Sequence, residues 1–253
     1  QGFDHWFGFL DQGQAHFHYP DRLWRNGEEV VMADNPKTHR HYVHDLFTEE
    51  GLKFIGENRA GPFFLYMAYT IPHAEILVPE DSQAPYIGRL GDPERPPVTE
   101  PYVLKGYNAP RYPRAARAGM ISRMDRDVGR MRALLEQFGI AENTLIVFSS
   151  DNGPATAGGS DIRFFRSAGP LRGIKRDLYE GGIRVPTIAW WPGKIAPGGT
   201  TDMPSAFWDW LPTFADLAGA PTGAPTDGVS LAPSLLGRNE RQAAHGHLFW
   251  DYS

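Results

Sequence analysis

The chain has 253 residues, of which 41% are hydrophobic and 13% aromatic, so it can bury a sizeable core and is not intrinsically disordered. Its formal net charge of −5 argues against a general binder of nucleic acid or of anionic membranes. The absence of cysteine excludes disulfides, thiolate metal sites and a cysteine nucleophile, and no apolar run approaches the length of a membrane span.

The first part of the chain mixes loops with apolar segments. Residues 1–30 combine aromatic and histidine residues with glycine and proline, which predicts a loop with buried rings. Apolar positions at helical spacing from 42 to 55 predict a helix that ends near Gly61-Pro62, and the continuous apolar run 63–69 predicts a strand covered on both faces. Prolines crowd residues 79–114, and this density predicts a long surface excursion without a helix or central strand.

The second part alternates helical and strand patterns. Apolar residues recur at steps of three and four from 120 to 138, which predicts a long helix. Residues 144–148 and 185–191 predict two further strands, and 207–217 predicts a short helix ending near Gly219. The alternation favours an α/β architecture with a largely parallel sheet. We expect a solvated helix face to carry Arg123, Arg126, Arg130 and Arg132.

Three loops beside predicted strands carry polar residues suited to chemistry, since sites in α/β sheets gather beyond the carboxyl ends of strands. His73 follows the run 63–69, where a structural histidine is the alternative. Asp151 and Asn152 follow 144–148 and offer oxygen ligands for Ca²⁺ or Mg²⁺, although an ordinary turn is also consistent. The glycine-rich residues 169–186 hold Lys175 and Arg184, which either face an anion or form surface pairs.

Five segments of the chain follow one another as they do in sulfatases. The resemblance covers nearly the whole chain and is closest to bacterial arylsulfatase A-like enzymes of the alkaline-phosphatase superfamily. The last two segments together are far more specific than either alone. The segments are residues 2–9, residues 19–27, Pro72-His73, Ser150-Asp151-Asn152-Gly153 and residues 173–186.

The resemblance implies a mostly parallel sheet flanked by helices, and hydrolysis of a sulfate ester with Ca²⁺ and a formylglycine nucleophile. Asp151 and Asn152 match two ligands of the family's Ca²⁺ site. Lys175 matches the lysine that contacts the sulfate, and His73 matches the histidine near the leaving-group oxygen, so both are implied to bind substrate and act in catalysis. The Gly181-Gly182 pair matches a segment that supports the loop.

Several parts of the family pattern are absent from these residues. No cysteine or serine stands in a C/S-x-P-x-R motif, and we assign no counterpart to the family's early metal-binding aspartate pair or to its Lys-x-His element that reaches the sulfate. We therefore expect residues 1–253 to be the C-terminal two-thirds of a sulfatase catalytic domain, cut at both ends, with the excursion at about 79–114. Alone, the chain is expected to bind Ca²⁺ weakly, to lack sulfatase activity and to associate with itself through exposed apolar surface.

Two other functions stay open. One is a phosphodiesterase or phosphonate hydrolase of the same superfamily, although Lys175 and an Asp-Asn pair favour a sulfatase. The other is a non-catalytic protein that binds an anionic glycan through Arg172, Lys175 and Arg184. The leading interpretation implies a sulfated small molecule or glycan as partner, and a periplasmic or secreted location.

Overall fold

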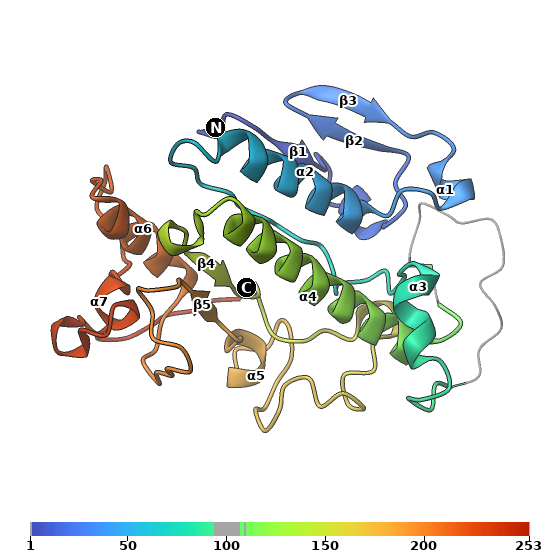
Figure 1. Ribbon diagram of the computed structural model, residues 1–253. Helices are drawn as coiled ribbons and strands as arrows, with labels where there is room; N and C mark the ends of the chain where they lie inside the picture. The colour runs from blue at the N-terminus through green and yellow to red at the C-terminus, as the bar shows by residue number, and fades with distance from the viewer. Residues whose placement is uncertain (1, 94–106, 109, 253) are drawn as a thin grey trace. The chain divides into compact units, whose positions relative to one another are not determined.

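The computed structural model describes residues 2–93, 107–108 and 110–252, which form two units. Unit 1 comprises Gln1–Phe138 and Pro154–Pro170, and unit 2 comprises Gly139–Gly153 and Leu171–Ser253. Unit 1 contains β1 (Phe7–Gly8), β2 (Arg22–Arg25), β3 (Glu28–Val31), α1 (Asn35–Thr38), α2 (Val43–Asn58), α3 (Glu80–Gln83) and α4 (Pro113–Gln137), with 3-10 turns at Gln14–His16, Ala84–Tyr86 and Ala157–Gly159. Unit 2 contains β4 (Ile146–Phe148), α5 (Glu180–Ile183), β5 (Ile188–Trp190), α6 (Trp210–Ala218) and α7 (Ala232–Leu235), with 3-10 turns at Ala141–Asn143, Phe207–Asp209 and Asn239–Arg241 (Figure 1).

The N-terminal residues form an antiparallel sheet of three short strands in the order β1-β2-β3. Strands β2 and β3 pair from Arg22 with Val31 to Arg25 with Glu28, and the turn between them is Asn26-Gly27. Both turn residues have positive φ, 49° and 91°, as the tight hairpin turn that suits twisted strands requires. The expectation of a loop over 1–30 is therefore wrong for these strands, whereas the buried rings of Phe17 and Tyr19 are confirmed.

Two long helices, α2 and α4, run side by side and cover the core of unit 1 (Figure 1). Both expected helices are present, and α4 begins earlier than its apolar stripe, at Pro113, because the first turn of a helix needs no N–H from proline. The core contains Tyr42 from the start of α2 and Met120 from α4, packed with rings and aliphatic side chains from the loops. Burial of this kind is the main favourable contribution to folding.

The arginines of α4 do not all lie on a solvated face. Arg123 is only 7% exposed, and its guanidinium bonds the carboxylates of Asp45 and Asp81 at 2.6 and 2.8 Å. Burial lowers the pKa of Arg123, but these hydrogen bonds and charges outweigh it and raise the pKa. Arg126 bonds the fully buried Asp127 at 2.8 Å. The expectation of a solvated face is therefore wrong for Arg123, because its partners come from distant parts of the chain.

In its described residues, the proline-rich excursion contains the short helix α3, flanked by Pro79 and Pro85. It packs on α4 at Gly119, where a Cβ atom would lie 2.7 Å from the Ser82 carbonyl oxygen. The expectation that no helix forms here is wrong for α3, because proline is compatible with the start of a helix and with the turn after it. Residues 94–106 and 109, which the excursion also includes, lie outside the described residues.

Residues 63–69 are not assigned to a strand and pair with no strand among the described residues of the chain. Alternate side chains face the protein, with Met67 and Tyr69 packing against the cluster of Leu23, Val43 and Phe47. Phe64 and Tyr66 are 56% and 65% exposed. The expected strand covered on both faces is thus covered on one face within the described part of the chain.

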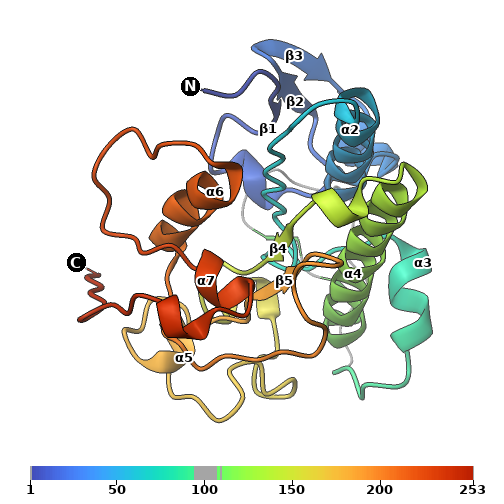
Figure 2. The same cartoon turned by 60° about the vertical axis from the view of Figure 1, so that its left-hand side comes forward.

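Unit 2 is built on the ladder of β4 and β5, with α6 and α7 beside each other (Figure 2). The two expected strands and the helix ending at Gly219, whose φ is 65°, are confirmed. The ladder is antiparallel, from Ile146 with Trp190 to Phe148 with Ile188. This differs from the expected parallel pairing because Gly153, past the end of β4, bonds Gly182, just before β5, so β5 starts where β4 ends.

The mixture of helices and short strands agrees with the expected α/β class, while every ladder within the described residues is antiparallel. No helix in residues 2–93 or 110–252 is both long enough and apolar enough to span a bilayer.

Candidate active site

The Asp151-Asn152 turn follows the carboxyl end of β4 in unit 2. The Asn152 amide nitrogen donates to the Gly153 carbonyl at 2.9 Å, and the Ser150 hydroxyl donates to the Asn152 carbonyl at 3.1 Å. Asn152 therefore keeps its side-chain oxygen for another partner. Asp151 is exposed, and within the described part of the chain its carboxylate makes no hydrogen bond or ion pair.

These two side chains fit part of a hard-cation site. A carboxylate and an amide oxygen are ligands that Ca²⁺ accepts, but the ion takes about six to eight oxygens. No group of three or more His, Cys, Asp and Glu side chains able to hold a metal occurs among the described residues. Asp151 and Asn152 thus supply a minority of a Ca²⁺ coordination shell.

The turn is docked on the glycine-rich loop through its last residue. The Gly153 N–H donates to the Gly182 carbonyl at 2.9 Å, and a Cβ atom on Gly153 would collide with the Gly181 carbonyl oxygen. Only glycine permits this backbone approach. The contact brings the Asp151-Asn152 turn and the loop of Lys175 to the same part of unit 2.

Lys175 is half-buried on a closed turn of that loop. The Asp177 carboxylate accepts the Ile174 N–H at 2.9 Å, and the Asp177 N–H donates to the Ile174 carbonyl at 2.9 Å. Gly181 and Gly182 are buried, and Cβ atoms there would meet the carbonyl oxygens of the same loop. These glycines therefore pack the loop against itself, which agrees with a supporting segment rather than with room left for a ligand.

The two arginines considered for anionic-glycan binding have partners of their own. The Arg184 guanidinium forms an exposed ion pair with Glu180 at 2.5 Å. The Arg172 guanidinium lies 3.7 Å from the centroid of the Tyr179 ring. The surface-pair interpretation of Arg184 is confirmed by this geometry.

His73 lies in unit 1, on the bend that follows the extended residues 63–69. Its backbone N–H donates to the Thr70 carbonyl at 3.0 Å, and its Nδ1 lies 2.9 Å from the Ala74 carbonyl oxygen. A carbonyl oxygen only accepts, so this contact places a proton on Nδ1. The half-buried imidazole is therefore oriented by its own bend.

Sequence reasoning missed the groups that surround His73. The His16 ring lies 5.1 Å from the His73 ring and 5.6 Å from the Tyr107 ring, measured between centroids. Beneath them, the fully buried Glu75 carboxylate accepts the His18 N–H at 2.8 Å and the Asn108 amide at 2.7 Å. No spacing rule joins these residues, because even His18 and Glu75 are 57 positions apart along the chain, and His16 and Tyr107 are farther apart still.

Two further polar groups behind the bend are buried. Burial lowers the pKa of His18 to about 4, although its contact with the Leu77 carbonyl opposes this shift. Burial also lowers the pKa of Arg117, whose guanidinium reaches the Pro72 carbonyl only at 3.5 Å. Burial therefore disfavours the charged forms of His18 and Arg117 behind the bend.

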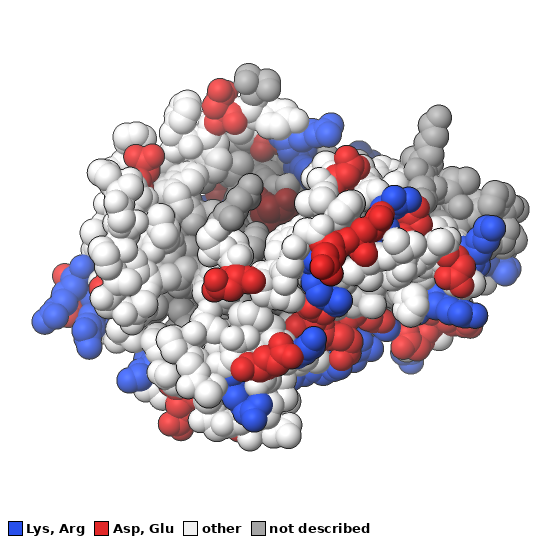
Figure 3. Space-filling view, turned by 90° about the horizontal axis from the view of Figure 1, so that it is seen from above, with Lys and Arg blue, Asp and Glu red and all other residues white. Residues whose placement is uncertain are grey.

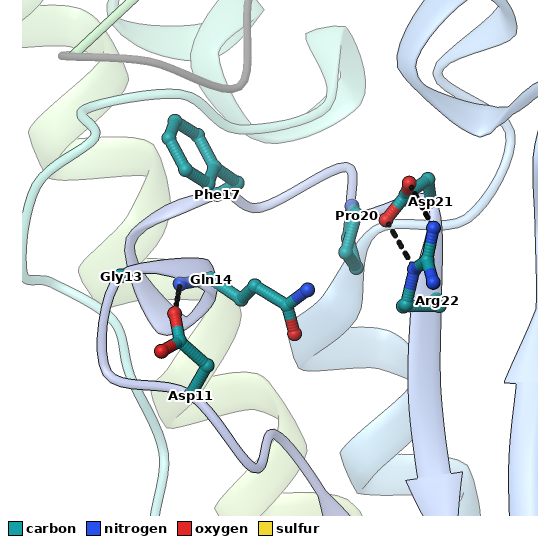
Figure 4. Close-up of a pocket in the computed structure, with 7 residues that line it drawn as sticks. All are labelled: Asp11, Gly13, Gln14, Phe17, Pro20, Asp21 and Arg22. Atoms are coloured by element: carbon teal, nitrogen blue, oxygen red, sulfur yellow. Dashed lines mark hydrogen bonds and ion pairs between the residues drawn. The ribbon is translucent and has the colours of Figure 1, made fainter.

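A cavity of about 280 Å³ also lies in unit 1, and none of the four predicted site residues lines it. Figure 4 shows the Gln14 side chain extending toward Pro20, with the Asp11 carboxylate turned back to accept the Gln14 N–H at 2.9 Å. Asp21 and Arg22 pair with each other at its edge. The charged side chains that line the cavity thus each have a partner, a backbone N–H for Asp11 and an ion pair for Asp21 and Arg22.

Comparison with known proteins gives a consistent family match. A family model described as Sulfatase matches residues 1–220. The chain is 32% identical to N-acetylgalactosamine-6-sulfatase of Mus musculus, over 93% of this chain and 42% of that protein. It is 34% identical to arylsulfatase A of Homo sapiens, over 78% of this chain and 32% of that protein. The chain therefore spans less than half the length of these relatives.

Solved structures give the same result for the fold. A crystal structure of Ps i-CgsB in complex with k-i-k-neocarrahexaose matches with a TM-score of 0.71 and 28% identity, covering 94% of this chain and 51% of that one. A structure of BT4656 in complex with D-glucosamine-2-N,6-O-disulfate matches with a TM-score of 0.67 and 20% identity, covering 94% of this chain and 59% of that one.

Proposed function

The chain belongs to the sulfatase family, and from that premise we propose that the whole protein hydrolyses a sulfate ester of a carbohydrate or an aryl compound. The observation that carries the proposal is the docking of the Asp151-Asn152 turn on the Lys175 loop, through the hydrogen bond between Gly153 and Gly182. It supports a site in which two oxygen ligands would hold a cation near the Lys175 loop. A cation and an ammonium group are the charges that stabilise a tetrahedral anion.

We propose Ca²⁺ as the metal, held by the Asp151 carboxylate and the Asn152 side-chain oxygen together with ligands from other parts of the protein. Both side chains fit this role, because the amide nitrogen of Asn152 is engaged by Gly153 while its oxygen remains. When bound, the ion would stabilise negative charge on the sulfuryl oxygens.

We propose a separate role in catalysis for Lys175 and for His73. The Lys175 ammonium would stabilise charge on a sulfuryl oxygen. The His73 proton on Nδ1 is directed to the Ala74 carbonyl, so Nε2 is the atom that would donate a proton to the departing oxygen when the ring is charged.

The 253 residues alone are proposed to be inactive. The family's formylglycine nucleophile forms from a cysteine or serine in a C/S-x-P-x-R motif, and the sequence holds no such motif. Two oxygen ligands are also too few for firm Ca²⁺ binding. The complete protein is the form to test, and a periplasmic or secreted location is proposed for it from the family.

The substrate class is proposed from the relatives. One relative is named for a 6-sulfated N-acetylgalactosamine, and one matched structure holds a neocarrahexaose. A sulfated sugar is therefore the first candidate substrate for this protein.

The test measures turnover of a sulfated N-acetylhexosamine, 4-nitrophenyl sulfate and bis(4-nitrophenyl) phosphate by the full-length protein. We expect the sulfates to be hydrolysed faster than the phosphodiester. Because removing one transition-state donor costs about 10²–10³ in rate, Lys175→Ala and His73→Ala should each lower kcat/KM by that factor. Lys194→Ala removes an exposed lysine of the same unit and should keep wild-type kinetics.

Two other results would overturn the proposal. Faster turnover of the phosphodiester would indicate a phosphodiesterase of the same superfamily. No turnover, together with glycan binding that is lost on Arg172→Ala and Lys175→Ala, would indicate a non-catalytic glycan-binding protein.

A further inference from the structure

We propose that His16 and Tyr107 form a wall of rings beside His73 that receives the sugar or aryl part of the ester. The inference rests on the proposed function, because His73 marks the leaving-group end of the site only if the protein cleaves sulfate esters. It adds two residues that determine substrate specificity.

The three rings form a continuous row in unit 1. His16 stands in the middle, 5.1 Å from His73 and 5.6 Å from Tyr107, with both ring planes tilted by 57°. His73 and His16 are half-buried, and Tyr107 is 45% exposed. The row therefore emerges from the protein into solvent, starting at the imidazole that would meet the departing oxygen.

This exposure separates the row from ordinary core packing. Rings that only fill a core are buried, as Phe17 and Tyr19 are in the same stretch of chain. A row of tilted, partly exposed rings offers flat apolar surface with polar edges. Such a surface fits a sugar or aryl ring, which has an apolar face and polar substituents.

Glu75 fixes the wall to the bend that carries His73. Its N–H donates to the His16 carbonyl at 3.1 Å, and its carboxylate accepts the N–H of His18 and the amide of Asn108. Glu75, two positions after His73, thus bonds the backbone of His16 and the side chain of Asn108, which follows Tyr107. The wall and His73 are therefore positioned as one body, as recognition of a leaving group requires.

The experiment uses the full-length protein and separates binding from catalysis. KM and kcat are measured for a sulfated N-acetylhexosamine and for an alkyl sulfate without a ring, and Kd is measured for the unsulfated N-acetylhexosamine, which is the product. His16→Ala and Tyr107→Ala should each raise KM for the sugar sulfate, and Kd for the sugar, roughly threefold to tenfold. KM for the alkyl sulfate should change by less than about twofold, because it lacks the ring that the wall would contact.

Two sets of control variants test whether the effects come from loss of the ring and whether they are specific to the wall. His16→Phe and Tyr107→Phe keep a ring and should restore KM and Kd to near wild type. His41→Ala and Tyr66→Ala remove exposed rings elsewhere in unit 1 and should leave both values unchanged.

Failure of this inference and failure of the proposed function give different results. If His16→Ala and Tyr107→Ala release sulfate with wild-type KM and Kd, the proposed ring wall is wrong and the proposed sulfatase activity stands. Sugar binding that weakens in both variants, without release of sulfate by the wild type, would overturn the sulfatase and keep the ring wall as a sugar-binding surface. Wild-type protein that neither binds the sugar nor releases sulfate would overturn both.

Discussion

Buried histidines link the stability of unit 1 to pH. His18 is fully buried, and desolvation lowers its pKa to about 4, against the opposing contact with the Leu77 carbonyl. His44 is also fully buried, and burial lowers its pKa to about 4 despite the adjacent carboxylate of Asp127. Both side chains are therefore neutral in the folded protein above about pH 4.

Acidification should destabilise the protein through these residues. Below about pH 6.5 the unfolded chain takes up protons that the folded chain does not, so stability is complete above about 6.5 and falls as the pH drops toward 4. For His18 alone the loss reaches about 3 kcal/mol. The melting temperature of His18→Gln, followed from pH 7 to 4, should therefore fall less steeply than that of the wild type.

His41→Gln is the matched control, since His41 is exposed in the same unit, and its profile should follow the wild type. Parallel curves for the wild type and for His18→Gln would show that His18 does not titrate as the structure requires.

Arg123 shows why single residues were predicted less well than helices. The spacing of the α4 arginines is that of a solvated face. Arg123 is nevertheless buried, and it bonds Asp45 and Asp81, which are 78 and 42 positions away in the sequence. The same holds for Glu75, whose partners come from residues 18 and 108. Partners at such separation leave no periodic signal, so tertiary structure alone reveals them.

At the scale of elements, local sequence patterns predicted the helices and strands that local interactions determine. Helices α2, α4 and α6 and strands β4 and β5 follow from apolar periodicity and from glycine at helix ends. The β2–β3 hairpin also had a local signal, Asn26-Gly27 between apolar positions, which the density of rings in residues 1–30 obscured. The direction of β5 had none, because the docking of Gly153 on Gly182 sets it.

The contact between α3 and α4 depends on a glycine. A Cβ atom on Gly119 would lie 2.7 Å from the Ser82 carbonyl oxygen, and this atom belongs to backbone that cannot rotate away. We expect Gly119→Ala to lower the free energy of unfolding by about 1–3 kcal/mol, because it forces α3 off α4.

Gly129→Ala on the same helix is the matched control. Nothing lies within 4 Å of a Cβ atom there, so the variant should gain roughly 0.5–1 kcal/mol from helix propensity. Chemical denaturation of both variants measures the difference. A Gly119→Ala variant as stable as Gly129→Ala would contradict the close packing of α3 on α4.

At the scale of the whole chain, the charged groups are mixed rather than sorted. On the face shown in Figure 3, acidic and basic side chains lie among one another without a patch of a single sign. This distribution agrees with the low net charge and with a small anionic ligand recognised at a local site.

Each unit carries some of the predicted site residues. Unit 2 carries Asp151, Asn152 and Lys175, which the sequence motifs identified and the Gly153–Gly182 contact brings to one region. Unit 1 carries His73 with the ring wall. Apolar side chains such as Phe64 and Tyr66 are exposed on unit 1, and self-association of the isolated chain through such surface stays a prediction.

The return of activity with Ca²⁺ tests the central claim, that the turn after β4 holds the metal of a sulfatase. Full-length protein is stripped with a chelator, and sulfate release is followed as Ca²⁺ is added back. Wild type and Asp202→Ala, which removes an exposed aspartate of the same unit, should recover together. Asp151→Ala should need at least about tenfold more Ca²⁺, since it loses a carboxylate ligand. Recovery of Asp151→Ala at the wild-type Ca²⁺ concentration and rate would contradict the account.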